Sequence, residues 1–355
     1  MDNYKKTLQE NYLEALNQPI NEEITEITQT QFISKYETDK SWAIGPFAKN
    51  DTYTFVKSTQ MADPTGIGWT SSSIFNPSTI IKDEKIYLYY RASVKKESLG
   101  SRVGLAIYTD GQGWEDYAEN PILFPTQENE ILSVEDPKVY KYGEDQYIMF
   151  YNGAWRASAE SVAEYAKPFG DVACDINYAL SSDLLHWEKK GLAVPYEISK
   201  LWAKGAVIPR NGQGEAVKID GEYLMFLSEG CGGFQYVGHS TNMIDWSFEK
   251  KEYLPLPDGF GKHIYEIACA IVNGDQLVMD FLYNDNNGHH AGAQALFDLS
   301  NPYTPLDFTH NATLAWGGML EYRGEWFFAQ GWDAPRGKEE MFFYSGGNPA
   351  SQSLS

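Results

Sequence analysis

Two neighbouring carboxylates precede a proline inside an apolar run, where they could transfer protons. The run LSVEDPKVY (132–140) contains Glu135 and Asp136. Two more acids, Glu229 and Glu266, lie in the apolar runs FLSEG and HIYEIACA. Carboxylates gathered in one pocket have perturbed proton affinities and can act as general acids and bases. Adjacent acids before proline can also form a simple turn at the start of a strand. Whether these residues are catalytic or structural therefore depends on the strands and turns that position them.

An internal repeat defines those elements. Each copy has an entry strand, a tight polar turn and an aromatic-rich strand, and the turns contain residues that hairpins require. The five copies span 76–93, 135–154, 214–230, 267–284 and 317–333. After the first three copies, Asp or Asn precedes Trp by four positions, which indicates a side-chain-nucleated turn and a Trp that pins the outer strand. These pairs are Asp110 and Trp114, Asp183 and Trp187, and Asn242 and Trp246.

The spacing of the copies predicts the fold. They begin about 50 to 80 residues apart, which leaves room for one four-stranded propeller blade with its loops. We therefore predict an all-β chain in which residues 71–355 form a five-bladed β-propeller, the catalytic domain. A sandwich of the same strands would not explain the repeated turn and Trp. Residues 1–70 are predicted to form a short helix over 4–17 and an irregular lead-in that packs on the propeller. The segment 156–170 is another candidate helix.

Composition narrows the choice of partners. The chain has 28 Lys+Arg and 49 Asp+Glu, a formal net charge of −21, which argues against nucleic-acid and anionic-membrane partners. No apolar stretch reaches the length of about 18 residues that spanning a membrane needs. The N-terminus lacks a secretory signal, so we expect a cytoplasmic protein, or a periplasmic or secreted one if a leader was removed. The three cysteines are expected to be buried free thiols.

A propeller would gather polar residues at its axis, because the first strand of every blade lines the central channel. The starts of these strands carry Asn76, Asp136, Glu215 or a neighbour, and Glu266. The ends of the second strands carry Arg91, Asn152, Glu229, Asn284 and Asp333. We therefore expect several carboxylates and an arginine to converge on one axial pocket.

Several segments together resemble glycoside hydrolase family 130, in the order of that family and over roughly residues 70–335. They are NPSTI (76–80), YLYYRAS (87–93), SRVGLAIYTDG (101–111), NPILFP (120–125), EDPKV (135–139), SSDLLHW (181–187), KIDGEYLMF (218–226) and ALFDLSNP (295–302). The resemblance implies a five-bladed β-propeller that cleaves β-mannosides with inversion, as a phosphorylase or a hydrolase. It implies an oligosaccharide substrate with mannose in the sugar subsite, and no metal or organic cofactor.

The resemblance also implies roles for single residues. Asp136 matches the general acid of the family, whose proton is thought to pass through a substrate hydroxyl. Asn76, Arg91 and Asp333 match ligands of the glycone sugar. The further predicted substrate ligands are Arg102, Glu135, His263 and Asp285, and Lys218 matches a lysine of the family's phosphate site.

The second reactant decides the type of reaction. Inversion needs either a base that holds water or a bound phosphate on the opposite face of the sugar ring. Glu229 stands where phosphorylases carry a cation, and Glu266 lies in a segment that is Gly-rich and Pro-containing in phosphorylases. We therefore predict an inverting hydrolase that releases mannose, with Glu229 or Glu266, or both, as the base.

Four alternatives remain open. One is a phosphorylase that uses inorganic phosphate as co-substrate and releases mannose 1-phosphate, with Lys218 helped by Arg156, Lys204 and Arg210. Another is that one or both glutamates only form salt bridges with Lys218, Lys262 or Arg210. The third is a non-catalytic glycan-binding propeller, and the fourth is an arabinan- or fructan-acting propeller of another family, whose sequence motifs match this chain less well. A homo-oligomer is compatible with the sequence, which does not give the glycosidic linkage.

Overall fold

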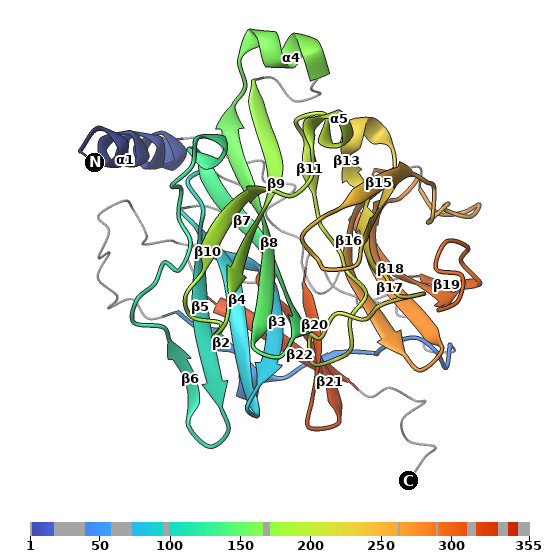
Figure 1. The fold of residues 1–355 in the computed structure, drawn as a ribbon. Helices are drawn as coiled ribbons and strands as arrows, with labels where there is room; N and C mark the ends of the chain where they lie inside the picture. The colour runs from blue at the N-terminus through green and yellow to red at the C-terminus, as the bar shows by residue number, and fades with distance from the viewer. Residues whose placement is uncertain are drawn as a thin grey trace.

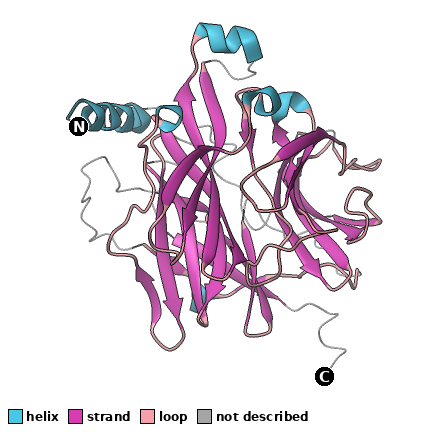
Figure 2. Ribbon diagram, viewed as in Figure 1, coloured by secondary structure: helices cyan, strands magenta, loops and turns pink. Residues whose placement is uncertain are grey.

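The computed structural model describes residues 2–17, 40–57, 73–94, 99–165, 171–261, 263–288, 290–310, 317–332 and 340–346. Antiparallel sheets follow one another along the chain and form the five-bladed propeller that the sequence predicts (Figure 1). Strands make up most of the described chain, and its α-helices gather at the upper end of the sheets in Figure 2.

The first two blades are regular four-stranded sheets. Blade 1 has the order β3 (Ser73–Lys82), β4 (Lys85–Ser93), β5 (Arg102–Thr109) and β6 (Gly113–Asp116). Blade 2 has the order β7 (Ser133–Gly143), β8 (Gln146–Arg156), β9 (Val172–Ser181) and β10 (Glu188–Leu192). The short helix η2 (Glu128–Glu130) precedes blade 2.

Blade 3 has an irregular inner edge. Its sheet contains β12 (Tyr223–Leu227), β14 (Tyr236–Ser240) and β15 (Ser247–Lys250). Val207 exchanges backbone hydrogen bonds with Phe226, so the segment before residue 210 takes the innermost place without forming a regular strand. A two-stranded ribbon of β11 (Ala203–Lys204) and β13 (Glu229–Gly230), followed by η3 (Cys231–Gly233), completes this blade.

The last two blades differ in how the chain builds them. Blade 4 has the order β16 (His263–Asn273), β17 (Gln276–Asn284), β18 (His290–Asp298) and β19 (Asp307–His310). Blade 5 combines β20 (Gly318–Tyr322), β21 (Glu325–Gln330) and β22 (Glu340–Gly346) with β1 (Ala48–Lys49) and β2 (Phe55–Val56), which both pair with β22. Strands of the fifth blade therefore lie inside the segment that the sequence analysis assigned to the lead-in.

Helices connect and cover the sheets at one end. The helix α1 (Asp2–Asn17) matches the helix expected over 4–17, and α4 (Ala159–Tyr165) lies within the second helical candidate. The short α5 (Tyr196–Ser199) leads into β11, and η1 (Asp51–Tyr53) lies between β1 and β2. In the described part of the chain, none of the helices has the length and apolar character for crossing a membrane.

Five buried clusters fill the five blade interfaces. On β8, Ile148 and Phe150 pack toward blade 3, whereas Tyr147 and Met149 pack toward blade 1. This alternation follows from the two-residue period of a strand, and it makes both faces of every sheet apolar. The three cysteines, Cys174, Cys231 and Cys269, are buried free thiols, as predicted.

The repeated Trp packs against the preceding blade. Trp187 contacts Tyr89 edge-on at 5.7 Å between ring centroids, and Trp246 contacts Phe150 at 6.2 Å. The residue four positions earlier shapes the turn in both cases: one carboxylate oxygen of Asp183 accepts from the N–H groups of Leu185 and His186 at 2.8 Å. The repeat therefore joins blades to one another as well as building each blade.

Candidate active site

The strands β3 and β7 carry the same backbone irregularity at the axis. Asn76 has φ 46° and Asp136 has φ 53°, and the strand register shifts at both positions. Asn and Asp tolerate this left-handed conformation better than most residues, and each is followed by a proline. Such bulges redirect a side chain. The result is that the Asn76 Nδ2 donates a hydrogen bond to the Asp136 Oδ1 at 2.7 Å.

Two cations surround the Asp136 carboxylate. The Arg91 Nη1 donates to its Oδ1 at 3.1 Å, and the Lys204 Nζ donates to its Oδ2 at 2.9 Å. Burial opposes ionisation of Asp136, but the charges of Lys204 and Arg91 outweigh burial and hold the pKa of this carboxyl well below its usual value. Asp136 is therefore ionised in the unliganded site at neutral pH.

Glu135 shares the same two cations. Its carboxylate pairs with the Arg91 Nη2, and its Oε1 lies 3.6 Å from the Lys204 Nζ. The Arg91 Nε also donates to the hydroxyl of Ser101 at 2.8 Å, so the guanidinium is fixed from both sides. On the opposite side, the Trp332 indole N–H donates to the Asn76 Oδ1 at 2.7 Å and links blade 5 to the cluster.

Glu266 faces the same small cavity as Asp136. Asn76, Asp136, Lys138 and Glu266 are among the residues that line this cavity at the axis. The Glu266 Oε1 pairs with the Lys138 Nζ at 2.8 Å. Burial opposes the charge of Lys138, but Glu266 more than compensates and raises the pKa of this lysine. Carboxylates from blades 2 and 4 therefore line one axial cavity, as the repeat predicts.

Glu215 or a neighbour was expected at the axis of blade 3, and Lys204 was expected only as a helper of Lys218 in a phosphate site. The structure corrects this position, because Glu215 is exposed and pairs with Lys141 at 2.7 Å. Lys204 and Gly205 occupy the axial place instead. A Cβ on Gly205, which has φ +69°, would lie 2.8 Å from the Glu266 Cγ. The sequence feature that could have indicated this position is the pair Lys204-Gly205, directly before the apolar run AVI (206–208).

Glu229 lies beside this group on the neighbouring backbone. It is half-buried and is the strand partner of Lys204 in the β11–β13 ribbon. The position is consistent with the expectation that Glu229 belongs to the axial region. In the described structure the salt bridge of Glu266 is with Lys138, a partner that the sequence analysis did not name.

Two predicted ligands lie away from the axial cavity. Lys218 is exposed, donates to the carbonyl oxygen of Thr241 at 2.8 Å, and is not among the residues that line the cavity, so its phosphate-site role stays a prediction. Arg102 is buried, donates to the carbonyl oxygen of Ser101 at 2.9 Å, and is not among the residues that line the cavity.

The remaining predicted ligands lie at the edge of blade 4 or outside the described chain. His263 begins β16 and pairs with Asn284 in register. Asp285 follows β17 and accepts from the N–H of Asn287 at 2.8 Å, which makes it part of a turn. Asp333 lies outside the described residues, directly after Trp332.

The arrangement suits proton transfer near a neutral, hydroxyl-rich ligand. Three cations, Arg91, Lys138 and Lys204, pair with three carboxylates, Glu135, Asp136 and Glu266. Polar groups of both signs provide donors and acceptors for sugar hydroxyls. Among the residues that the structure describes, no group of His, Cys, Asp and Glu could hold a metal ion.

Comparison with known proteins identifies the family. A family model of glycoside hydrolase family 130, described as β-1,4-mannooligosaccharide phosphorylase, matches residues 46–269. The chain belongs to glycoside hydrolase family 130. This match confirms the resemblance seen in the sequence. The enzymes of this family act on mannosides.

Individual relatives are more distant. A 1,2-β-oligomannan phosphorylase of Thermoanaerobacter sp. (strain X514) is 25% identical over 251 residues, which cover 66% of this chain and 72% of the relative. A β-1,2-mannobiose phosphorylase of the same organism is 31% identical over 96 residues, 24% of this chain and 31% of the relative.

Solved structures of family 130 have the same fold. One belongs to a study of glycoside hydrolases of this family that target β-1,2-mannosidic linkages in Candida mannan. It has a TM-score of 0.66 and 19% identity, and the match covers 88% of this chain and 97% of that chain.

Proposed function

We propose that this protein cleaves β-1,2-linked mannosides with inversion and that Asp136 supplies the proton to the leaving sugar. The observation that carries the proposal is the convergence of Asn76, Arg91 and Asp136 at the axial cavity, with Glu266 across from them. Membership of a mannoside-acting family supports the sugar, and the names of the two curated relatives support the β-1,2 linkage.

Both relatives are named phosphorylases, which supports inorganic phosphate rather than water as the acceptor of the mannosyl group. The expectation of a hydrolase is therefore not confirmed. The charge state of Asp136 also favours phosphate. Asp136 is ionised beside Lys204 and Arg91, whereas a general acid must carry a proton. A phosphate anion bound near Lys204 would weaken the hold of that cation on Asp136 and raise the pKa of the carboxyl. Phosphate would then be both the nucleophile and the group that prepares the acid.

Hydrolysis is the second candidate, because one observation favours it. Glu266 lies in the same cavity as Asp136, and Glu229 lies on the strand beside Lys204. Carboxylates at these places could hold and activate a water molecule on the far side of the sugar ring. The balance of three cations and three carboxylates also leaves no excess positive charge among these six residues for an anion.

The experiment that tests the proposal is incubation of the protein with β-1,2-mannobiose, with and without inorganic phosphate. Phosphorolysis predicts mannose 1-phosphate, detected by phosphorus NMR, and a rate that rises with phosphate concentration. Free mannose as the sole product, at a rate that does not depend on phosphate, would establish the hydrolase instead. Absence of cleavage of β-1,2-, β-1,3- and β-1,4-mannobiose under both conditions would overturn the proposed function.

A further inference from the structure

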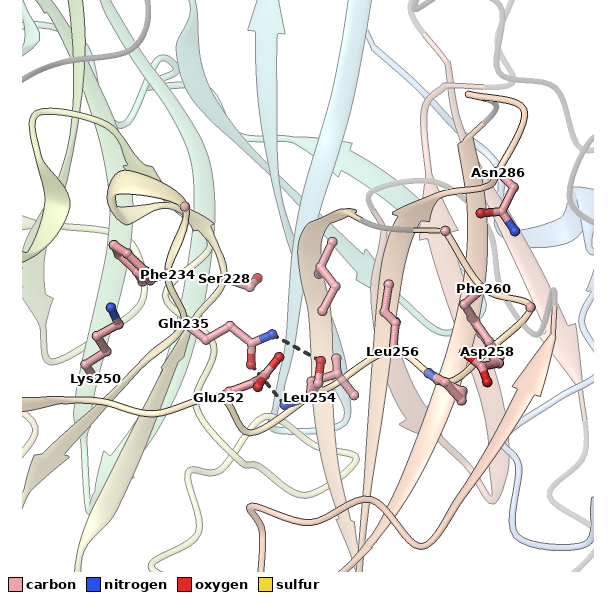
Figure 3. Close-up of a pocket in the computed structure, with 15 residues that line it drawn as sticks. Ser228, Phe234, Gln235, Lys250, Glu252, Leu254, Leu256, Asp258, Phe260 and Asn286 are labelled. Atoms are coloured by element: carbon pink, nitrogen blue, oxygen red, sulfur yellow. Dashed lines mark hydrogen bonds between the residues drawn. The ribbon is translucent and has the colours of Figure 1, made fainter.

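A second cavity lies between blades 3 and 4, outside the axial site. Its volume is about 820 Å³, within the range of roughly 300–1,000 Å³ that is typical of small-molecule sites. Figure 3 shows the side chains that surround it, from the loop after β13 on one side to Asn286 on the other. We call this cavity the inter-blade groove and define it by Phe234, Gln235, Glu252, Leu256, Asp258 and Asn286.

The groove is held in shape before any ligand binds. The Gln235 side chain fixes one wall: its Oε1 accepts from the N–H groups of Tyr253 and Leu254 at 2.9 Å, and its Nε2 donates to the Leu254 carbonyl at 3.1 Å. Phe260 is buried against Tyr283, with 5.1 Å between ring centroids. A preformed site loses little entropy on binding.

Glycine fixes the second wall. A Cβ on Gly261 would lie 1.3 Å from the carbonyl oxygen of Asn284. Only glycine permits this approach of the loop to the end of β17. The loop that carries Asp258 is therefore anchored to blade 4.

The chemistry of the groove suits an uncharged, hydroxyl-rich chain. Glu252 and Asp258 are exposed acceptors, and Asn286 adds an exposed amide. Phe234 supplies an apolar surface that is 47% exposed, although the Lys250 ammonium lies 2.9 Å from its ring centroid. Apolar surface beside hydrogen-bonding groups is the combination that binds sugars, which have both apolar faces and hydroxyl edges. Two carboxylates and one ammonium disfavour a phosphate or another anion.

The groove adjoins the axial site through two strands. Ser228, which lines the groove, precedes Glu229, the strand partner of Lys204, and the Lys204 Nζ is 2.9 Å from the Asp136 Oδ2. Ile264, also in the groove, is two residues from Glu266 in the axial cavity. We propose that the inter-blade groove binds the distal mannosyl units of oligosaccharides longer than a disaccharide. This inference rests on the proposed function and names the length of substrate that the enzyme prefers.

The test compares substrates of two lengths. We would measure kcat/KM for β-1,2-mannobiose and β-1,2-mannotetraose in the native protein, in Phe234→Ala and in Glu252→Gln. The control is Leu306→Ala, which truncates another exposed apolar side chain (63% exposed) outside the groove. The ratio of the tetraose value to the mannobiose value should fall about fivefold or more in Phe234→Ala and by a smaller factor in Glu252→Gln, and should stay unchanged in the control.

The outcomes separate this inference from the proposed function. If mannobiose is cleaved but the ratio does not change in Phe234→Ala, the groove does not bind substrate and the inference is wrong. If no mannoside is cleaved, the proposed function fails. Calorimetric titration of β-1,2-mannotetraose then shows whether the groove binds the oligosaccharide. Weaker binding to Phe234→Ala than to native protein would then support the groove, and equal binding would overturn it.

Discussion

At the scale of single residues, the proposed acid Asp136 and its partners are positioned by backbone conformation as much as by charge. Asn76 and Asp136 adopt left-handed backbone angles that most side chains avoid, and their side chains meet at 2.7 Å. Lys204 and Arg91 stabilise the ionised form of Asp136. Asp136 therefore gains a proton only when a bound substrate or anion changes this balance.

Removal of the Asp136 carboxylate should abolish most of the activity. We expect Asp136→Asn to lower kcat/KM for β-1,2-mannobiose by about 10²–10⁴, the usual contribution of a general acid. The matched control is Asp110→Asn, because Asp110 is on the surface and pairs with the exposed Arg323 at 2.7 Å. Steady-state kinetics on both variants tests this role, and an Asp136→Asn protein with more than a tenth of native activity would rule it out.

The buried carboxylate of Asp175 should make the stability of the fold depend on pH. Asp175 is fully buried, and burial raises its pKa to about 6 even though Asn129, Trp155 and Tyr196 donate hydrogen bonds to it. An unfolded chain would have this pKa near 3.9. The folded protein therefore binds the proton more tightly, and this group lowers the free energy of unfolding as pH rises from about 4 through 6.

The measurement is urea unfolding at pH 5 and pH 7.5 for the native protein and for Asp175→Asn. The native protein should lose about 1 kcal/mol more than the variant over this range. The comparison cancels the general effect of the net charge of −21, which both proteins share apart from one unit. Equal pH dependence in the two proteins would mean that Asp175 does not titrate there.

The sequence allowed some of these residues to be predicted and not others. Asp136, Glu266, Asn76 and Arg91 follow from the strand repeat, because equivalent positions of a propeller meet at the axis. Lys204 could not be placed in the same way, since the inner edge of blade 3 is not a regular strand. The phosphate-site role of Lys218 stays a prediction, because a resemblance in a short motif does not fix the direction of a side chain, and Lys218 here donates to the Thr241 carbonyl oxygen.

At the scale of elements, the β11–β13 ribbon controls the position of Lys204. Gly230 follows Glu229, has φ +81°, and lies so close to Trp202 that a Cβ would be 2.0 Å from its carbonyl oxygen. The ribbon therefore depends on a glycine at this place, both for its backbone angle and for the close approach of the two strands.

Substitution of Gly230 should disturb both stability and catalysis. We expect Gly230→Ala to lower the free energy of unfolding by more than the about 1 kcal/mol expected of Gly221→Ala, and to reduce kcat/KM by displacing Lys204. Gly221 has φ +87° but nothing within 4 Å of its Cβ position, so it controls for the cost of the backbone angle alone. Equal effects of the two substitutions on urea unfolding and kinetics would contradict this account.

The elements themselves were largely predictable. Hairpin turns at Asp220-Gly221, Gly274-Asp275 and Arg323-Gly324 all carry residues with positive φ, as their composition indicates. The packing of Trp187 and Trp246 on the preceding blade was not predicted, because a local motif gives no information about the neighbouring sheet.

At the scale of the whole molecule, residues from the beginning of the chain complete the last blade. β1 and β2 pair with β22, and Phe55 is buried beside Tyr90 of blade 1. The Gln294 amide of blade 4 exchanges hydrogen bonds with the backbone of Ile44 at 2.9 and 3.0 Å. The segment 40–57 thus joins blades 4, 5 and 1. The composition of this segment did not reveal these strands, because each has only two residues.

Truncation should distinguish this segment from the helix that precedes it. Deletion of residues 1–57 should lower the thermal unfolding midpoint by about 10 °C or more, since it removes two strands and buried side chains such as Phe55. Deletion of residues 1–17 removes only α1 and should cost a few degrees. Differential scanning calorimetry on both proteins tests this, and similar midpoints for the two deletions would show that β1 and β2 do not hold the ring together.

The pairing of β1 and β2 with β22 has a consequence for biosynthesis. β1 and β2 precede the other strands of the ring in the sequence, and during synthesis they must wait for β22 before they acquire their partners. Until then the face of blade 1 around Leu88 lacks the residues of β22, such as Phe343, that cover it in the closed ring. The Asn76–Asp136 pair of blades 1 and 2 gains its contact with Trp332 only when blade 5 has been made, so the axial cluster is completed by the last blade rather than blade by blade.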